Sequence, residues 1–286
     1  MRRLLVTGAS GMTGSEIVSR APGRGWDVLA LSHSELDIAD ADAVDARVRD
    51  FEPEIVINAA AYTAVDRAES EPEQAAHINA FGAGNVARAA RAASAGVIHL
   101  STDYVFSGDA HEPYKPDDFV GPRSVYGRTK LAGEVAVREG NENHCIVRTS
   151  WVFGITGTNF VLTMLRLAAE RNEIRVVADQ QGRPTYAGDL ADALLTAAEQ
   201  VRFSRKARGT YHFANSGETT WFDFARAIFD LRPKAGLNVV AISTADYPTP
   251  ARRPRYSVLD TTSFTERFGV IPRPWREPLR EMLPVV

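Results

Sequence analysis

The sequence predicts an α/β fold with a doubly wound parallel sheet, and two features of its first half carry that prediction. Short apolar runs recur, each long enough for one strand that is buried on both faces. They lie at 4–8, 28–32, 55–61, 97–102 and 144–150. Helical patterns alternate with them, at 14–21, 40–51, 73–93 and 125–138. Strands that alternate with helices in this way form a parallel sheet with helices on both faces.

The second half of the chain is less regular and predicts a smaller lobe. Helical patterns at 159–171, 189–201 and 220–230 flank a short strand pattern at 174–178. A loop rich in proline and arginine, TPARRPRYS, follows them. We therefore expect one domain over 1–152 and a smaller, interleaved lobe over 153–286, with about 181–205 returning to the first domain.

Composition narrows the class of protein. The 286 residues are 44% apolar, which is enough for a sizeable core, and the net charge of −3 argues against a nucleic-acid binder. The single cysteine, Cys145, has no partner for an internal disulfide, and no Cys/His spacing predicts a metal site. The first apolar run is too short for a signal segment, and no run approaches 18 apolar residues. We expect a cytoplasmic protein that binds neither membranes nor nucleic acids.

The first strand ends in TGASGMTG, residues 7–14, which is the context of a dinucleotide-binding turn. Gly8 permits the tight turn, Gly11 lets the backbone approach a pyrophosphate, and Gly14 allows close packing of helix on strand. The start of the following helix supplies unpaired N–H groups to the phosphates. This predicts a Rossmann-type domain over 1–152, with phosphate-binding residues Gly8, Gly11, Met12, Thr13 and Gly14.

The end of the second strand bears on the choice of cofactor. A protein that selects NAD usually has an acidic residue there, which binds the ribose 2′-hydroxyl. This strand ends in Ser32 and His33, while Glu35 lies beyond it, so we expect no carboxylate at the 2′ position. No arginine stands there to bind a 2′-phosphate either. NADPH is therefore favoured, with NADH as an alternative, and Asp37 and Ile38 are candidates for framing the adenine.

The segment SVYGRTKLAGE, residues 124–134, places Tyr126 and Lys130 one helical turn apart on one face. An ammonium at about 4 Å favours a phenolate by about 4 kcal/mol at an effective dielectric constant of about 20. That would lower the pKa of the phenol from about 10 to about 7. Such a tyrosine is a usable proton donor or acceptor at neutral pH. Thr102 ends the fourth strand at the edge where open α/β sheets bind their ligands.

A resemblance now adds to these patterns. The sequence resembles the dTDP-4-dehydrorhamnose reductases, which are extended short-chain dehydrogenase/reductases, from residue 1 to about 200 and more weakly over 253–264. It implies reduction of the 4-keto group of dTDP-4-dehydro-L-rhamnose (dTDP-6-deoxy-L-lyxo-4-hexulose) to dTDP-L-rhamnose, with NAD(P)H as hydride donor. It also implies a monomer or a homodimer. The motifs that carry it, in chain order, are TGASGMTG, VINAAAYTAVDRAESEP, STDYVFSG, SVYGRTKLAGE, RTSWVFG and DQQGRPTYAGDLA.

The resemblance implies a catalytic role for Thr102, Tyr126 and Lys130. Thr102 would orient the substrate carbonyl, Tyr126 would protonate its oxygen, and Lys130 would tune the phenol and bind the nicotinamide ribose. The loop after the third strand would lie beside the nicotinamide. The cofactor-binding residues implied in this way are Ala60, Ala61, Thr63, Tyr126 and Lys130.

The resemblance also implies that the C-terminal lobe binds substrate. Thr102, Asp103, Trp151 and Arg253 match its substrate contacts, with Arg253 directed at the diphosphate. For two of these a plainer interpretation stays open: Asp103 as a turn or cap carboxylate, and Trp151 as a core residue. An arginine presents two parallel donors to phosphate oxygens, which suits the role given to Arg253.

Departures from the family pattern leave alternatives. Tyr104 stands where related 4,6-dehydratases have an acid, which argues against dehydration. Glu16 matches one ligand of the family's Mg²⁺-bridged dimer, but Gly188 stands where another glutamate would be, so we predict no metal. A 4-epimerase would use the same Tyr/Lys pair. A reductase of another dTDP-linked keto-deoxysugar and a catalytically idle regulatory subunit on the same fold also stay open.

Overall fold

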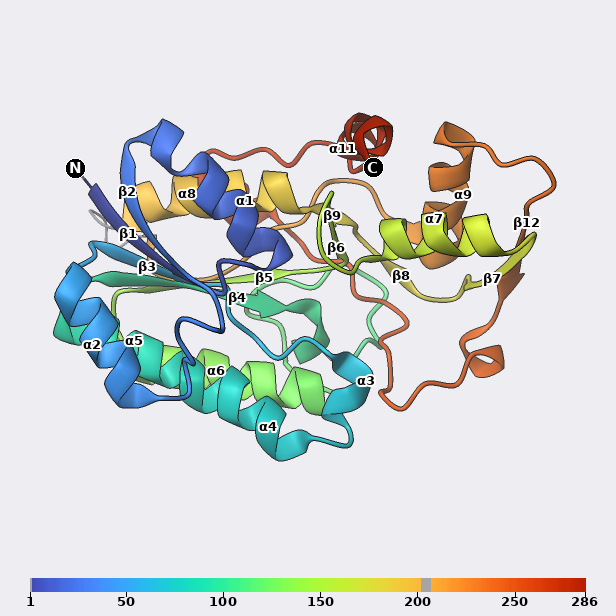
Figure 1. Cartoon of the computed structure of the whole chain (residues 1–286). Coiled ribbons are helices and arrows are strands. Elements are labelled where there is room, and N and C mark those ends of the chain that lie inside the picture. Colours follow the sequence, from blue (N-terminus) through green and yellow to red (C-terminus); the bar gives the residue numbers. More distant parts are fainter. Residues whose placement is uncertain (1, 202–206) are drawn as a thin grey trace.

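A computed structural model describes residues 2–201 and 207–286 (Figure 1). Its centre is a six-stranded parallel sheet with strand order β10-β5-β4-β3-β1-β2, which confirms the predicted doubly wound fold. The stretch 202–205, the end of the segment expected to return to the first domain, lies outside the described residues. The strands are β1 (Arg2–Thr7), β2 (Trp26–Leu31), β3 (Ile55–Asn58), β4 (Gly96–Thr102), β5 (His144–Thr149) and β10 (Gly209–His212).

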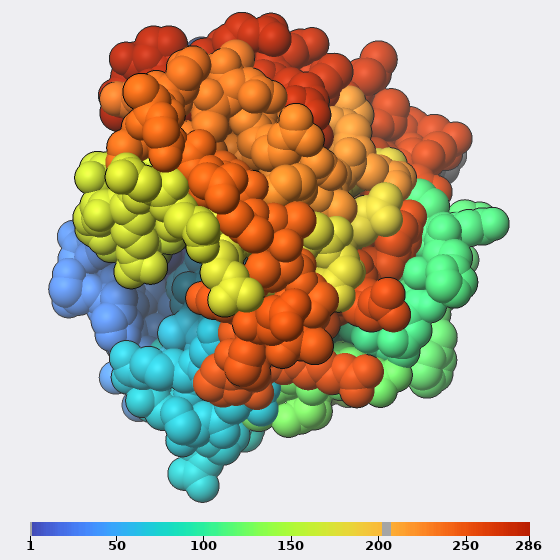
Figure 2. Space-filling view, turned by 90° about the vertical axis from the view of Figure 1, so that its right-hand side faces the viewer, coloured from blue at the N-terminus to red at the C-terminus, as the bar shows by residue number. Residues whose placement is uncertain are grey.

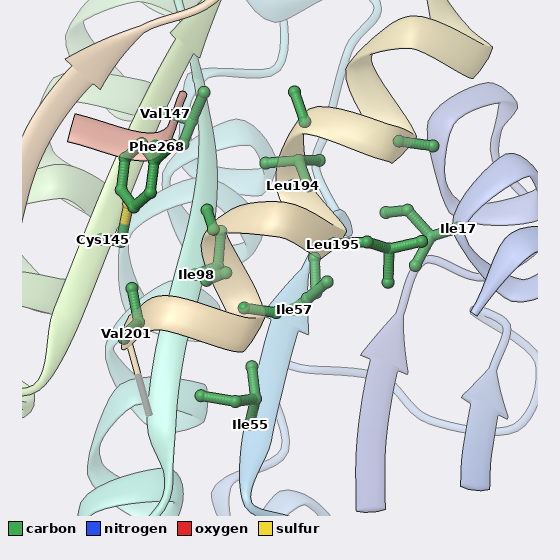
Figure 3. Close-up of a cluster of buried hydrophobic side chains, with 14 of the residues drawn as sticks. Ile17, Ile55, Ile57, Ile98, Cys145, Val147, Leu194, Leu195, Val201 and Phe268 are labelled. Atoms are coloured by element: carbon green, nitrogen blue, oxygen red, sulfur yellow. The ribbon is translucent and has the colours of Figure 1, made fainter. Parts of the chain in front are cut away.

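Helices cover both faces of this sheet, because its strands carry apolar side chains on both sides. On one face lie α1 (Met12–Arg20) and α8 (Ala187–Val201) (Figure 1). Helix α10 (Thr262–Phe268) packs in the same core cluster. Figure 3 shows Ile57 of the sheet and Ile17 of α1 directed towards Leu194 and Leu195 of α8. The other face is covered by α2 (Ala41–Phe51), α5 (Ala83–Ala92) and α6 (Val125–Gly140). Thus α8, β10 and α10, all from the second half of the sequence, lie in the Rossmann layers.

The helical region expected at 73–93 is divided. It consists of α4 (Pro72–Ala76), the π-helical turn η2 (His77–Gly82) and α5, and a short α3 (Val65–Ala68) precedes it. The side chain of Asn79 in η2 accepts from Tyr62 N at 2.8 Å and donates to Tyr62 O at 3.1 Å. It also donates to Thr129 Oγ1 of α6 at 3.1 Å. The π turn therefore holds the loop after β3 against α6, an example of a π-helix near a functional site.

The smaller lobe lies on the right in Figure 1. Its core lies between α7 (Phe160–Glu170), α9 (Trp221–Leu231), α11 (Arg276–Met282) and the parallel pair β7 (Glu173–Val177) and β12 (Asn238–Ile242). No helix within 2–201 and 207–286 is long and apolar enough to cross a membrane. The short elements are η1 (Pro22–Arg24), η3 (Asp103–Val105), β6 (Val152–Phe153), β8 (Gln181–Gly182), β9 (Thr185–Tyr186), β11 (Thr219–Thr220), η5 (Thr244–Asp246) and η6 (Leu283–Val285).

Candidate active site

The glycine-rich turn after β1 is shaped for a ligand. Gly8 has a φ of 67°, and a Cβ on it would lie 2.6 Å from Ala60 N, so the loop after β3 leaves no room for a side chain. A Cβ on Gly14 would lie 2.1 Å from Gly8 O. At Gly11, the N-cap of α1, a Cβ would meet only Gly8 O, at 3.2 Å, and no described side chain caps the helix. The start of α1 therefore presents an open edge and its own N–H groups, as pyrophosphate binding requires.

The two other predicted phosphate-binding residues follow Gly11 in the first turn of α1. Thr13 is buried. The Met12 side chain lies against Gly154, since a Cβ added to Gly154 would be 3.1 Å from it. Figure 2 shows a hollow between the blue, cyan and yellow-green segments of the chain. The glycine turn lies at the carboxyl ends of the strands, where open α/β sheets bind ligands.

The end of β2 corrects one expectation. The carboxylate of Glu35 accepts hydrogen bonds from Ser32 N at 2.8 Å and from Ser32 Oγ at 2.6 Å. A carboxylate therefore does lie at the end of this strand, because a tight turn brings the side chain three residues on back to Ser32. His33 and Asp37 are exposed, whereas Ile38 is only 3% exposed and packs in the core.

The first turn of α6 is held close to the end of β4. Ser124 is its N-cap and accepts from Gly127 N at 3.1 Å, while the Glu69 carboxylate accepts from a second N–H of this turn at 2.7 Å. A Cβ on Gly127 would lie 2.2 Å from Tyr104 O, so only glycine permits this approach. The glycine in the YGRTK sequence thus places Tyr126 beside the residues that follow β4.

Thr102, Asp103 and Tyr126 meet at this edge. Thr102 Oγ1 donates to Asp103 Oδ1 at 3.0 Å, and the Tyr126 ring meets the Tyr104 ring edge-on with centroids 5.5 Å apart. Asp103 is only 2% exposed, and burial raises the pKa of its carboxyl to about 6. The nearby Ser257 hydroxyl lowers that pKa in part. Yet neither Asp103 Oδ2 nor Ser257 Oγ has a well-formed hydrogen bond among the described residues.

The lowered pKa expected for the Tyr126 phenol beside Lys130 is wrong for this structure. Lys130 is 2% exposed, and its Nζ donates to the carbonyl of Leu100 on β4 at 2.7 Å. Burial lowers the pKa of Lys130 to about 8, and burial raises the pKa of Tyr126 despite an opposing hydrogen bond from Thr102. For both groups, the loss of hydrating water on burial has a larger effect on the pKa than any attraction between Lys130 and a Tyr126 phenolate. The Tyr126 phenol therefore keeps its proton at neutral pH.

The loop after β3 carries the three residues expected beside the nicotinamide. Ala60 and Ala61 are partly buried and Thr63 is exposed. Asn79, which the sequence analysis did not single out, holds Tyr62 in the middle of this loop. An asparagine inside a helical pattern is unfavourable unless its side chain finds such partners. Its presence in the helical pattern at 73–93 was therefore a sequence signal that could have identified Asn79.

Arg253 bridges the C-terminal loop to the catalytic edge. Its guanidinium pairs with the Asp66 carboxylate of α3 at 2.7 Å and donates to the Tyr104 hydroxyl at 3.2 Å. The other Asp66 oxygen accepts from Ala251 N at 3.2 Å. Figure 2 shows this orange segment lying against the cyan one. The arginine expected at the diphosphate is therefore close to Tyr126, with Asp66 as its present partner.

Trp151 lies just beyond β5 with a backbone φ of 48°, which is rare for a residue with a side chain. Its ring stacks on that of Trp221, with centroids 3.6 Å apart and planes at 7°. A Cβ on Gly182 would lie 2.5 Å from the Trp151 ring, so the indole is enclosed on a second side. Trp151 remains partly exposed beside the core of the smaller lobe. Trp221 was not predicted, although it opens the aromatic run WFDF.

The residues expected to bear on a metal have other contacts. Glu16 pairs with Arg20 at 3.0 Å, and a Cβ on Gly188 would lie 2.5 Å from the same guanidinium. Within the described part of the chain, no group of three or more His, Cys, Asp or Glu side chains is arranged to hold a metal ion.

These features define a Rossmann-fold protein of the short-chain dehydrogenase/reductase class. The whole chain, residues 1–286, matches the family model described as RmlD substrate binding domain. It is 44% identical to a dTDP-4-dehydrorhamnose reductase of Aggregatibacter actinomycetemcomitans, over 99% of this chain and 98% of that protein. A Mycolicibacterium smegmatis protein of the same name is 46% identical over 100% of this chain and 86% of its own.

A solved structure agrees. The crystal structure of dTDP-4-dehydrorhamnose reductase from Bacillus anthracis in complex with NADP superposes with a TM-score of 0.94, at 38% identity and with both chains fully covered. The chain therefore belongs to the dTDP-4-dehydrorhamnose reductase family, a family of NAD(P)H-dependent oxidoreductases, as the motifs predicted.

Proposed function

We propose that this protein reduces the 4-keto group of dTDP-4-dehydro-L-rhamnose to the alcohol of dTDP-L-rhamnose, with Tyr126 as proton donor. One observation carries the proposal. The Tyr126 ring lies with Tyr104, Thr102 and the buried Asp103 at the carboxyl edge of the parallel sheet, the same edge that carries the glycine turn. The names of the relatives support this substrate.

The glycine turn fits a dinucleotide cofactor, because Gly8 and Gly14 allow close backbone approach and the start of α1 is uncapped by described side chains. Gly11, Met12 and Thr13 would contact the pyrophosphate. Ala60, Ala61 and Thr63 would lie on the nicotinamide side. The bound cofactor would supply the hydride, and the NADP complex of the Bacillus anthracis relative supports NADPH as one donor.

The proton is handled by the chain itself. Thr102 would hold the substrate carbonyl by a hydrogen bond and direct its oxygen towards Tyr126. As carbon 4 gains hydride, its oxygen takes the phenolic proton, which leaves a phenolate on Tyr126. Lys130 is one helical turn away, and its positive charge would stabilise that phenolate more than the neutral phenol. A buried charge next to the site of reaction acts mainly on the charged state, which favours the transition state.

The smaller lobe, within 153–286, would bind the sugar nucleotide. The Arg253 guanidinium would leave the Asp66 carboxylate and bind the diphosphate. A guanidinium binds phosphate oxygens with the same two-donor geometry that it uses for a carboxylate. Trp151, held by Trp221, would pack on the sugar ring. Asp103, with one oxygen lacking a well-formed hydrogen bond among the described residues, would accept from a sugar hydroxyl.

The test is oxidation of NADPH by the purified protein with a panel of dTDP-linked 4-keto sugars. Fastest turnover with dTDP-4-dehydro-L-rhamnose, and dTDP-L-rhamnose as the product by NMR, would support the proposal. Faster turnover of another keto-deoxysugar would favour the first alternative. Tight binding of NADPH without oxidation by any sugar would favour the idle regulatory subunit.

A further inference from the structure

The end of β2 holds a carboxylate that the proposed reaction does not use. Glu35 is exposed, and it occupies two donors of one residue, the amide and the hydroxyl of Ser32. The Ser32 hydroxyl also lies 3.0 Å from that of Ser34. Hydrogen bonds from Ser32, aided by the attraction of Arg47, lower the pKa of Glu35, so the group is an anion at neutral pH.

The carboxylate lies beside the glycine turn. β2 pairs with β1 in a register that puts Leu31 opposite Thr7, and Ala9 N donates to Leu31 O at 3.1 Å. Ser32 is the next residue. In a dinucleotide-binding fold this position faces the adenosine ribose, where a carboxylate accepts from the 2′-hydroxyl. A 2′-phosphate at the same place carries about 1.5 to 2 negative charges and is repelled.

We propose that Glu35 is a specificity-determining residue for the ribose 2′ position. Bound to Ser32, it favours a cofactor with a free 2′-hydroxyl. A 2′-phosphate binds only after Glu35 leaves Ser32, whose two donors then serve the phosphate. The inference rests on the proposed cofactor site, and it goes beyond that site by assigning its selectivity to one side chain.

The experiment measures binding rather than turnover. Dissociation constants of ADP-ribose and 2′-phospho-ADP-ribose are determined by calorimetry for the wild type, for Glu35→Gln and for Glu73→Gln. The control removes the same charge from an exposed position on α4. In Glu35→Gln the preference for the phosphorylated ligand should rise about 10-fold. Close like charges repel each other even in water, and the phosphate carries more than one negative charge. The glutamine also loses the charge-assisted hydrogen bond to the 2′-hydroxyl, which weakens ADP-ribose binding.

The outcomes separate this inference from the proposed function. If both ligands bind and their affinity ratio is the same in the wild type and in Glu35→Gln, the role of Glu35 is overturned while the cofactor site stands. An equal change of the ratio in Glu73→Gln would show a general charge effect and would also overturn it. If neither ligand binds the wild type, the cofactor site itself fails.

Discussion

Helix α6 carries two buried charged residues one turn apart, and their surroundings differ. Glu134 is fully buried and accepts two hydrogen bonds from Arg148, one from Arg138 and one from Ser101, at 2.7 to 2.8 Å. Burial alone would raise its pKa, but these partners outweigh burial and lower it. Among the described residues, Lys130 has no comparable set of charged hydrogen-bond partners. Its ammonium donates to the Leu100 carbonyl, and burial lowers its pKa to about 8.

This is the difference expected between a structural charge and a charge in the proposed reaction site. The protein compensates Glu134 with its own cations, so the group serves to join α6 to β4 and β5. For Lys130 on α6 and Asp103 on η3, burial shifts the pKa against the charged form, which is typical of groups that act on a ligand. Substitutions at the two places should therefore separate activity from stability.

The largest effect is expected from Tyr126→Phe. The substitution keeps the ring, including its contact with Tyr104, and removes the proposed proton donor. Turnover of the keto-sugar should fall about 10² to 10⁴-fold, the usual contribution of a general acid. The dissociation constant of NADPH, measured by fluorescence, should stay near that of the wild type. Turnover within a factor of three of the wild type would show that another group supplies the proton.

At the other end of the comparison, Glu134→Ala should mainly cost stability. It leaves the Arg148 guanidinium, 2% exposed, without its carboxylate, and breaking a buried pair typically costs about 3 to 5 kcal/mol. Urea denaturation measures the loss. Glu139→Ala, on the exposed side of the same helix, controls for the change in helix propensity. A loss for Glu134→Ala no larger than for this control would mean that the pair is not a structural link.

Asp103→Asn should change stability in the opposite direction to Glu134→Ala. The variant should lose activity but be more stable than the wild type at neutral pH. Burial raises the folded pKa of Asp103 from 3.8 to about 6, so the folded state binds the proton more tightly than the unfolded chain. Stability is therefore lost as pH rises from about 4 to about 6, and the loss, on the order of 3 kcal/mol, persists above that range. Asparagine does not titrate, so the variant should not show this pH-dependent loss of stability.

The check for Asp103→Asn is urea denaturation near pH 4 and at pH 8. The variant should match the wild type at the lower pH and exceed it at the higher one. Asp117→Asn, at an exposed position, should show no such divergence. A stability difference for Asp103→Asn that is equal at both pH values would rule out titration as its cause.

The smallest effect is expected from Arg253→Ala, which should raise the KM for the sugar nucleotide about 10-fold or more, because hydrogen bonds to charged groups contribute about 1.5 to 3 kcal/mol. The KM for NADPH should change little. Arg252→Ala removes the same charge from the exposed neighbouring position and serves as control. Equal effects of the two variants, or an equal rise in both KM values, would remove Arg253 from the substrate site.

Much of this protein was determined by local sequence. Strands β1 to β5 and most of the helices that flank the sheet follow from apolar runs and helical periodicity, because backbone hydrogen bonding and burial act over a few neighbouring residues. The sequence analysis did not predict β10 or α10. The glycine turn is local in the same sense, since Gly8 needs its positive φ wherever the rest of the chain lies. The spacing of Tyr126 and Lys130 likewise needs only one helix.

Only the tertiary structure decided what those residues experience. Arg253 and Asp66 are 187 positions apart, and nothing in either segment predicts their pairing. The effect of Lys130 on Tyr126 depends on how much water burial removes and on the Leu100 carbonyl from a neighbouring strand. The Glu35 carboxylate accepts from Ser32 because a turn follows β2. A continued extended strand would have kept the two side chains apart, so their spacing in the sequence did not predict the contact. Spacing along the chain sets which residues share an element, whereas solvation and charge depend on every segment packed around them.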